Sequence, residues 1–449
     1  MRSITLKNFR CFRAEQTAKL APLTLLVGEN STGKTSFMAM IRALWDVAYR
    51  YQIPDFKEPP YDLGSFDEIA YNRGARGGQV DTFEAGFDPN NLIVFKNDAT
   101  DKVRPYHLNI TFAKDGTVPV PVRRRMTCED LWIEEFLEPK NRDFRFRVGT
   151  EKGSWEFKAS LDLGSPSDFA HYAIAPFFYT LPEEVEGLSP LEGSEKITKK
   201  DLERLREFWG FCFTGLFRKA DRPYASAPVR SEPKRTYDPA RLSSDPEGDY
   251  VPMYLANAYA RQRRVWNYLK NELERFGQAS GLFDEITVKH LGKTLGSPFQ
   301  LQVRKFAGRR KGPWKNLVDV GYGISQVLPV VTELFRQDAA PLVLLQQPEV
   351  HLHPSAQAAL GTLFCQIAVR SSQLVVETHS DYIVDRVRME VRDNNIPLKP
   401  EDVSILFFER KELDVHIHSL RLDEEGNILD VPPNYRNFFM EESRRLWGL

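Results

Sequence analysis

Residues 28–35 read Gly-Glu-Asn-Ser-Thr-Gly-Lys-Thr and lie between the apolar run Leu23–Val27 and a helix-forming stretch at 36–45. The pattern G-x-x-x-x-G-K-[ST], placed between a strand and a helix, is typical of a phosphate-binding loop (P-loop). Its glycines let the backbone turn so that N–H groups face phosphates. We predict that this loop binds ATP and Mg²⁺, with the lysine on the β- and γ-phosphates and Thr35 on the metal. The predicted nucleotide-binding residues here are Gly28, Glu29, Asn30, Ser31, Thr32, Gly33, Lys34, Thr35 and Ser36.

The composition is that of a globular intracellular protein. The chain has 449 residues, of which 42% are hydrophobic and 27% charged, and this length predicts about three domains. A net charge of −1 excludes nucleic-acid binding through overall charge and leaves only local patches. Four scattered cysteines without a C-x-x-C pair favour a reducing compartment over disulfides or zinc. Since we find neither a signal peptide nor 18 consecutive apolar residues, we expect a cytoplasmic protein with no membrane contact.

The pattern of apolar residues predicts an α/β fold in three parts. Residues 4–9 alternate as a half-buried strand does, and 51–90 is a turn-rich loop. Short alternating segments near 92–96, 106–112, 118–122, 144–149 and 155–161 indicate an antiparallel sheet. Helices are predicted at 198–219 and 252–276, with a proline-rich loop at 220–249 between them. Beyond residue 318, apolar strands alternate with helices, as in a buried parallel sheet. The predicted domains are an N-terminal lobe at 1–195, an inserted helical arm at 196–284 and a C-terminal lobe at 285–449.

Three later segments carry polar residues at places where nucleotide chemistry needs them. A buried strand at 342–345 is followed by Gln346-Gln347-Pro348-Glu349, and a second strand, at 374–376, by Glu377-Thr378-His379-Ser380. Residues 320–326 open a helix with two glycines and a serine, and a helix N-terminus binds anions. The candidate catalytic residues are Gln347, Glu349, Glu377 and His379, Gln346 is a candidate metal ligand, and Gly321, Gly323, Ser325 and Gln326 are candidate nucleotide-binding residues.

The order of these motifs resembles that of the ABC-type ATPases of the SMC, RecF and OLD group. Residues 6–12 resemble the first strand of that group, 321–326 its signature motif, and 377–380 its switch-histidine strand. Residues 348–354 read Pro-Glu-Val-His-Leu-His-Pro and resemble the P-E-x-H-L-H-P segment of OLD-like ATPases. The resemblance implies an ABC-type head with a mixed sheet, and pairs of heads that enclose ATP. Gly323 and Ser325 of one subunit would then meet the γ-phosphate bound by another, in a homo-oligomer of head-to-head dimers, either a dimer or a hexamer.

The chain lacks an acidic Toprim nuclease motif after His379, so we expect an ATPase without its own nuclease. It resembles stand-alone ATPases of anti-phage systems, in length and layout first AriA of PARIS and alternatively PtuA of Septu. That resemblance implies a sensor and regulator that holds a separate toxic effector, a Toprim-type or HNH nuclease, and releases it on a phage protein trigger. Two alternatives stay open: a RecF-like DNA-repair ATPase that clamps duplex DNA, and a non-hydrolysing scaffold that uses ATP as a structural ligand.

Gln346 and Gln347 depart from the family pattern, which has acidic residues at both positions. A neutral amide cannot accept a proton from the attacking water. Three interpretations remain: hydrolysis is slow and the protein is an ATP-gated clamp; Glu349 or Glu377 supplies the carboxylate; or a glutamine is an engineered substitution that traps ATP.

Two basic runs could contact phosphates. One is 123–125, within an alternating Val-Pro segment, and the other flanks Gly308 and Gly312 as at the tip of a hairpin. Nucleic-acid contact through phosphates is one interpretation, and a solvated charged turn is the other. The residues of the second run are Arg304, Lys305, Arg309, Arg310 and Lys311.

Overall fold

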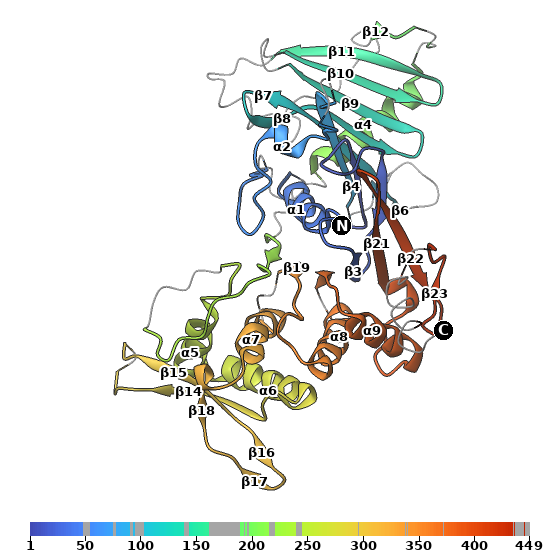
Figure 1. Ribbon diagram of the computed structural model, residues 1–449. Helices are drawn as coiled ribbons and strands as arrows, with labels where there is room; N and C mark the ends of the chain where they lie inside the picture. The colour runs from blue at the N-terminus through green and yellow to red at the C-terminus, as the bar shows by residue number, and fades with distance from the viewer. Residues whose placement is uncertain are drawn as a thin grey trace. The chain divides into compact units, whose positions relative to one another are not determined.

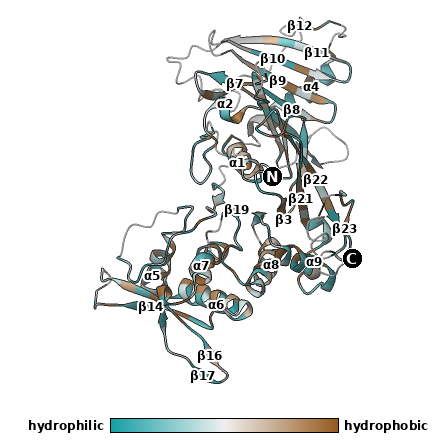
Figure 2. Ribbon diagram, viewed as in Figure 1, coloured by the Kyte–Doolittle hydropathy of each residue, from teal (hydrophilic) through white to brown (hydrophobic). Residues whose placement is uncertain are grey.

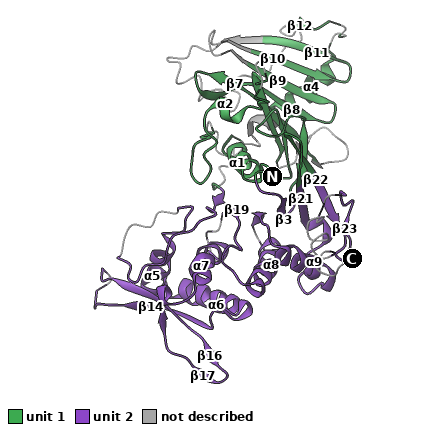
Figure 3. Ribbon diagram, viewed as in Figure 1, with its two compact units in different colours: residues 1–20, 31–222, 408–417 green, residues 21–30, 223–407, 418–449 purple. Residues whose placement is uncertain are grey.

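The computed structural model (Figure 1) divides into two compact units, each built from separate stretches of the chain. Unit 1 comprises residues 1–20, 31–222 and 408–417, and unit 2 comprises 21–30, 223–407 and 418–449 (Figure 3). The structure describes all residues except 48–53, 75–77, 90–92, 95–102, 139–142, 161–188, 193, 195–196, 215–220, 239–244, 295, 337, 339, 371, 434, 436–443 and 445–449.

Unit 1 is built on a nine-stranded antiparallel sheet, which confirms the antiparallel subdomain. Its strands, in spatial order, are β12 (Ser189–Pro190), β11 (Gly153–Ser160), β10 (Asp143–Thr150), β9 (Leu131–Glu138), β8 (Val118–Cys128), β7 (His107–Asp115), β4 (Thr82–Asp88), β1 (Ser3–Lys7) and β2 (Gln16–Lys19). A separate two-stranded ribbon joins β5 (Ile93–Val94) and β6 (Val103–Arg104). The described residues of this unit form the helices α1 (Lys34–Trp45), α2 (Phe66–Ile69) and α4 (Lys199–Thr214).

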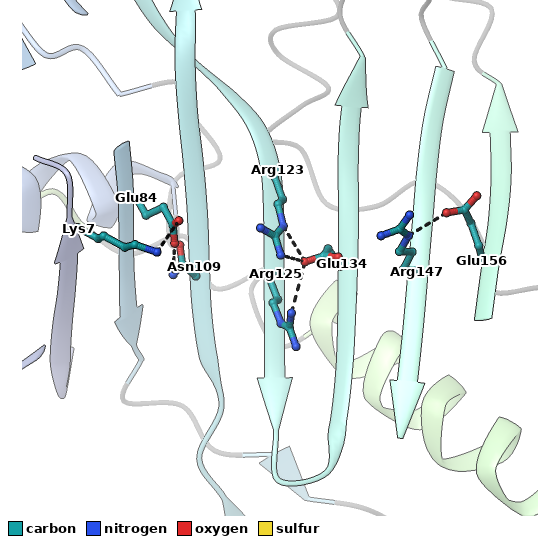
Figure 4. Close-up of polar contacts among 8 residues, drawn as sticks. All are labelled: Lys7, Glu84, Asn109, Arg123, Arg125, Glu134, Arg147 and Glu156. Carbon is teal, nitrogen blue, oxygen red and sulfur yellow. Dashed lines mark hydrogen bonds and ion pairs between the residues drawn. The ribbon is translucent and has the colours of Figure 1, made fainter. Parts of the chain in front are cut away.

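One face of this sheet forms a core and the other carries paired charges. On the core face, Phe83 stacks on Phe112 with ring centroids 5.0 Å apart, and Trp209 of α4 packs edge-on against Phe146. The run 123–125 alternates between the faces. Arg123 and Arg125 pair with Glu134 on the polar face (Figure 4), whereas Arg124 makes a buried ion pair with Glu135 on the core face. These three arginines are therefore structural.

Two predictions for unit 1 were wrong. Strand β4 lies inside the stretch that we predicted as a loop. Residues 3–6 of β1 are buried on both faces rather than half-buried. The reason is that the polar residues of β1 are small and hydrogen-bonded: Ser3 Oγ donates to Asp88 at 2.6 Å, and the hydroxyls of Thr5 and Thr17 lie 3.0 Å apart.

Unit 2 contains the predicted buried parallel sheet. Strands β13 (Tyr224–Ala225), β19 (Leu342–Gln346), β20 (Gln373–Glu377) and β3 (Leu23–Gly28) run parallel in this order. The strand order continues with β21 (Val403–Lys411), β22 (Asp414–Leu422) and β23 (Ile428–Leu429), although residues 408–417 of β21 and β22 belong to unit 1. The helices α7 (Tyr322–Leu334), α8 (Pro354–Ala368) and α9 (Asp381–Asp393) follow in the chain, with short 3-10 turns at Leu317–Asp319 and Pro400–Asp402. Hydrophobic residues are concentrated on α7 and α8 (Figure 2).

The predicted helix at 252–276 is two helices, α5 (Val251–Arg261) and α6 (Arg263–Ser280). The backbone breaks at Gln262 (φ −130°, ψ 64°), and across the break Tyr259 packs edge-on against Trp266 at 5.2 Å. A small sheet follows, formed by β14 (Glu285–His290), β15 (Phe299–Arg304) and β18 (Lys315–Asn316), and it supports a hairpin of β16 (Phe306–Ala307) and β17 (Arg310–Lys311).

The helices that we grouped as one inserted arm belong to different units. Helix α4 is part of unit 1, whereas α5 and α6 are part of unit 2. The predicted boundary at 195/196 lies outside the described residues. The three-part division at 195 and 284 therefore stays a prediction.

Candidate nucleotide site

The carboxyl ends of three parallel strands bring the predicted segments together within unit 2. In the strand register, Gln346 of β19 faces Glu377 of β20, and Glu377 faces Leu26 of β3. The N–H of Thr378 donates to the carbonyl of Leu26 at 3.1 Å, and β3 ends at Gly28, where the P-loop begins. In open α/β sheets, ligands bind outside the carboxyl ends of the strands. This edge of the sheet is therefore the candidate site.

The P-loop has the backbone that its glycines require. Gly28 and Gly33 adopt positive φ values of 137° and 85°. A Cβ atom at Gly33 would lie 2.6 Å from Cys11 Sγ, so both conformation and space demand glycine here. Helix α1 starts at Lys34 directly after the loop, with Gly33 at its N-cap, and the dipole of a helix N-terminus favours an anion. In unit 1, the exposed Arg410 donates to the carbonyl of Ser31 within the loop.

The buried carboxyl group of Glu349 has the features of a general base. The N–H of His379 donates to its Oε1 at 2.7 Å. Its Oε2 is buried and accepts no hydrogen bond from any described residue. Burial raises the pKa of this carboxyl group, against the opposing effects of the backbone N–H groups of His379 and Glu349, the Thr378 side chain and the charge of Arg230. A carboxylate with one oxygen held by a hydrogen bond and the other without a partner among the described residues can accept a proton from a water molecule that reaches it.

Arg230 is a site residue that the sequence did not reveal. Its Nη2 donates to the carbonyls of Gln346 and Gln347, at 3.0 and 3.3 Å. The guanidinium is almost fully buried, and its Nε and Nη1 find no partner in the described part of the chain. Burial lowers the pKa of Arg230 to about 10. The residue lies in the stretch predicted as a loop, and a lone arginine outside any motif gave no signal.

The two glutamines differ in their surroundings. Gln346 is buried, and its Nε2 donates to the carbonyl of Ser226 at 3.2 Å, which ties β19 to the segment after β13. Gln347 is half-buried, has a positive φ of 41°, and donates its N–H to the carbonyl of Glu377 at 2.9 Å. Their contacts with Mg²⁺ and with water stay predictions, as does a chemical role for the buried Glu377.

The signature segment packs on the turn that carries Glu349. A Cβ atom at Gly323 would lie 2.9 Å from the carbonyl oxygen of His351, and the Tyr322 ring lies 5.7 Å from the His351 ring. Ser325 is buried and donates to the carbonyl of Tyr322 at 2.8 Å. The contacts of Gly321, Gly323 and Ser325 with a nucleotide stay predictions.

Gln326, His353 and Ser380 make hydrogen bonds within the fold. The Gln326 amide makes hydrogen bonds to both the N–H and the carbonyl of Arg230, each at 3.3 Å. His353 caps α8 by accepting the N–H of Ser355. His379 is exposed at the end of β20, and Ser380 caps α9. A nucleotide contact of Gln326 and a catalytic role of His379 stay predictions.

The described residues contain neither a candidate membrane span nor a preformed metal-binding cluster. None of their helices is long and apolar enough to span a membrane. They contain no group of three or more histidine, cysteine, aspartate or glutamate side chains that could hold a metal ion. The residues do fit Mg²⁺ bound with a phosphate, because the exposed Thr35 presents a hydroxyl in the first turn of α1.

A loop with the P-loop pattern directly after the buried parallel strand β3 is typical of a P-loop ATPase. Residues 23–385 match the family described as "AAA domain, putative AbiEii toxin, Type IV TA system". The match covers most of the chain, and the chain belongs to this family. It is also 20% identical over 423 residues to an OLD nuclease of Thermus scotoductus, covering 87% of this chain and 61% of that protein. These findings confirm the predicted OLD-like ATPase class.

Solved structures of SMC heads show a remote likeness. An SMC head bound to the C-terminal winged-helix domain of ScpA aligns with a TM-score of 0.43 and 12% identity, covering 94% of this chain and 98% of that one. The SMC head domain of Thermotoga maritima gives a TM-score of 0.37 and 11% identity, with 93% and 98% covered.

Proposed function

We propose that this chain is an ATP-driven sensor and regulator of phage defence in the cytoplasm. It binds ATP and Mg²⁺, holds a separate toxic effector, and releases the effector when a phage protein is sensed. The observation that carries the ATPase part is the P-loop on β3 together with the buried Glu349 at the same edge of the sheet. The family description, which names an Abi toxin and a toxin–antitoxin system, and the OLD relative support the defence context.

In this proposal, Lys34 and the N-terminus of α1 bind the phosphates, and Thr35 would hold Mg²⁺, which supplies charge neutralisation when bound. A water molecule attacks the γ-phosphorus and transfers its proton to Glu349 Oε2, while ADP departs with the bond between the β- and γ-phosphates broken. The raised pKa of Glu349 suits a proton acceptor better than an ordinary solvated carboxylate would. Gln346 and Gln347 orient the metal and the attacking water. Because their amides are neutral and cannot act as bases, ATP turnover is slow.

Assembly is part of the same proposal. Gly321, Gly323, Ser325 and Gln326 contact the nucleotide bound by another subunit, so that ATP closes pairs of heads into a dimer or a hexamer. The two states differ by contacts to the γ-phosphate, and hydrolysis shifts the population from one to the other. The effector, a Toprim-type or HNH nuclease such as those of PARIS and Septu, is retained in one state only.

Co-purification tests the regulator role. The tagged chain, as wild type and as Lys34→Ala, is expressed together with any Toprim-type or HNH nuclease that a neighbouring gene encodes. We expect the wild type to retain the nuclease in an ATP-dependent way and the variant to lose that dependence, because the lysine contacts the phosphates. Equal retention by both proteins, with and without ATP, would refute the regulator role.

A non-hydrolysing scaffold is the second candidate, and Gln346 and Gln347 favour it because neither amide can act as a base. It predicts ATP binding without phosphate release. A RecF-like clamp on duplex DNA is the third candidate. The basic β16–β17 hairpin favours it, because exposed arginines can contact DNA phosphates.

A further inference from the structure

Residues 286–316 form a strongly basic arm in a chain of nearly neutral charge. This stretch, here called the basic arm, contains eight lysines and arginines and no aspartate or glutamate, whereas the whole chain has 61 basic and 62 acidic residues. It comprises most of β14, all of β15 and β18, and the β16–β17 hairpin, which extends away from the helices of unit 2 (Figure 1). Such clustering of one charge is the electrostatic footprint of an anion-binding surface.

Three of the cations hold the arm together. Arg304 and Lys311 both pair with Glu285, the latter at 2.8 Å. The Arg304 guanidinium also lies 4.2 Å from the centroid of the Trp314 ring. Lys305 donates to the carbonyl of Gly281 at the end of α6. These contacts fix the base of the hairpin and leave its tip to present other charges.

The remaining five cations are exposed and uncompensated. Arg309 and Arg310 lie at the tip beside Gly308, which turns the chain with a φ of 61°. In the described part of the molecule, no carboxylate lies within ion-pair distance of either, nor of the exposed Lys289, Lys293 and Lys315. Unpaired charge of one sign on a protruding ribbon has no stabilising partner within the fold.

The other basic run behaves differently. Arg123 donates through Nε to Glu134 at 2.6 Å, and Arg147 donates to Glu156 at 2.8 Å (Figure 4). Their charge is compensated inside the sheet. Among the described residues, each arginine of the run 123–125 has a carboxylate within ion-pair distance, whereas Arg309 and Arg310 of the basic arm have none.

We infer that the basic arm binds double-stranded DNA by its phosphate backbone. A two-stranded β-ribbon fits the major groove, where a basic tip lies between two rows of phosphates. Arg309 and Arg310 contact the phosphates, and the exposed Phe306 and Trp314 contact sugars at the edge of the groove. Because the arm carries charge but few amide side chains for reading bases, binding is independent of sequence. This DNA contact goes beyond the proposed effector regulation and does not depend on it.

The test measures fluorescence anisotropy of a labelled duplex of about 30 base pairs between about 50 and 200 mM salt. It compares the full-length wild type with the double variant Arg309→Gln/Arg310→Gln. The matched control Arg370→Gln/Lys399→Gln removes the same charge from exposed positions of unit 2 outside the arm. We expect the tip variant to bind about tenfold or more weakly at low salt, with the slope of log K against log salt flatter by about two. The control should match the wild type.

A charge-preserving variant, Arg309→Lys/Arg310→Lys, should retain binding, and ATP binding by every variant reports that the fold is intact. Three results would overturn the inference: no duplex binding by the wild type, equal affinity and slope in the Arg→Gln tip variant, or tighter binding to a single-stranded oligothymidylate of equal length. Retained DNA binding with no effector retention would separate this inference from the proposed regulator role.

Discussion

Glu349 is a buried carboxyl group. Its burial makes it a better proton acceptor but lowers the stability of the folded protein when the group is ionised. Its Oε1 accepts one backbone hydrogen bond, and its Oε2 accepts none within the described residues. Burial raises its pKa above the usual 4.5. A charge kept out of water in this way is costly unless it is used.

The pH dependence of stability should reveal this cost. Because the folded pKa of Glu349 is raised, its contribution to stability is fully present below the unfolded pKa and is lost as pH rises through the folded pKa. Glu349→Gln should therefore raise the melting temperature at about pH 8, by roughly 2–4 °C for each kcal/mol regained, and the gain should vanish near pH 4. Thermal melts across this range measure it, with the exposed Glu401→Gln as control. A gain that is the same at every pH would contradict the assignment.

Among single residues, those that belong to a motif with fixed spacing could be predicted from the sequence. The P-loop could be identified because its chemistry needs glycines and a lysine at set intervals, and both glycines have the positive φ expected. Arg230 could not be identified, because its role comes from a parallel pairing of β13 with β19 that places it under the carbonyls of Gln346 and Gln347. No local pattern encodes a contact over 116 residues.

Among the elements, the N-terminus of α7 and the turn after β19 are coupled by close packing at Gly323. The two signature glycines provide a matched comparison. A Cβ at Gly323 would lie 2.9 Å from a backbone oxygen, whereas no atom of the described residues, chain neighbours aside, lies within 4 Å of a Cβ at Gly321.

Gly323→Ala should lower the stability of the protein by about 1–3 kcal/mol, as overpacking does, and Gly321→Ala should leave it nearly unchanged. Thermal or denaturant unfolding measures both. Equal effects of the two substitutions would show that α7 does not pack against the turn as described. Loss of ATP-driven assembly in a stable Gly321→Ala protein would instead assign that glycine to the nucleotide contact.

Strands β4 and β9 were not predicted because their sequences do not alternate strictly between apolar and polar residues. Strand β9 has Glu135 on the core face, where it pairs with Arg124, so its pattern reads as polar on both faces. Strand β4 contains Gly86, where a side chain would collide with His107 and the carbonyl of Leu108 at 2.8 Å. Buried ion pairs and packing glycines remove the hydrophobic period on which strand prediction relies.

For the whole molecule, the proposal requires ATP to change the assembly state. Light scattering after size exclusion should show an even-numbered oligomer with ATP and Mg²⁺, and a smaller species without nucleotide. Lys34→Ala should stay in the smaller species, since a charge-assisted phosphate contact of about 1.5–3 kcal/mol is lost, which weakens ATP binding by roughly 10- to 100-fold. An odd-numbered assembly, or one that is unchanged by nucleotide in the wild type, would contradict head-to-head pairing.

Multiple-turnover ATP hydrolysis by the wild type, Glu349→Gln and Gln347→Glu tests the central claim most directly. We predict that the wild type releases phosphate over many turnovers, and that Glu349→Gln still binds ATP but hydrolyses it about 10²- to 10⁴-fold more slowly, the usual contribution of a general base. Hydrolysis that is equal in the wild type and Glu349→Gln, or that occurs only in Gln347→Glu, would contradict the claim. The last result would make this chain an ATP-locked form.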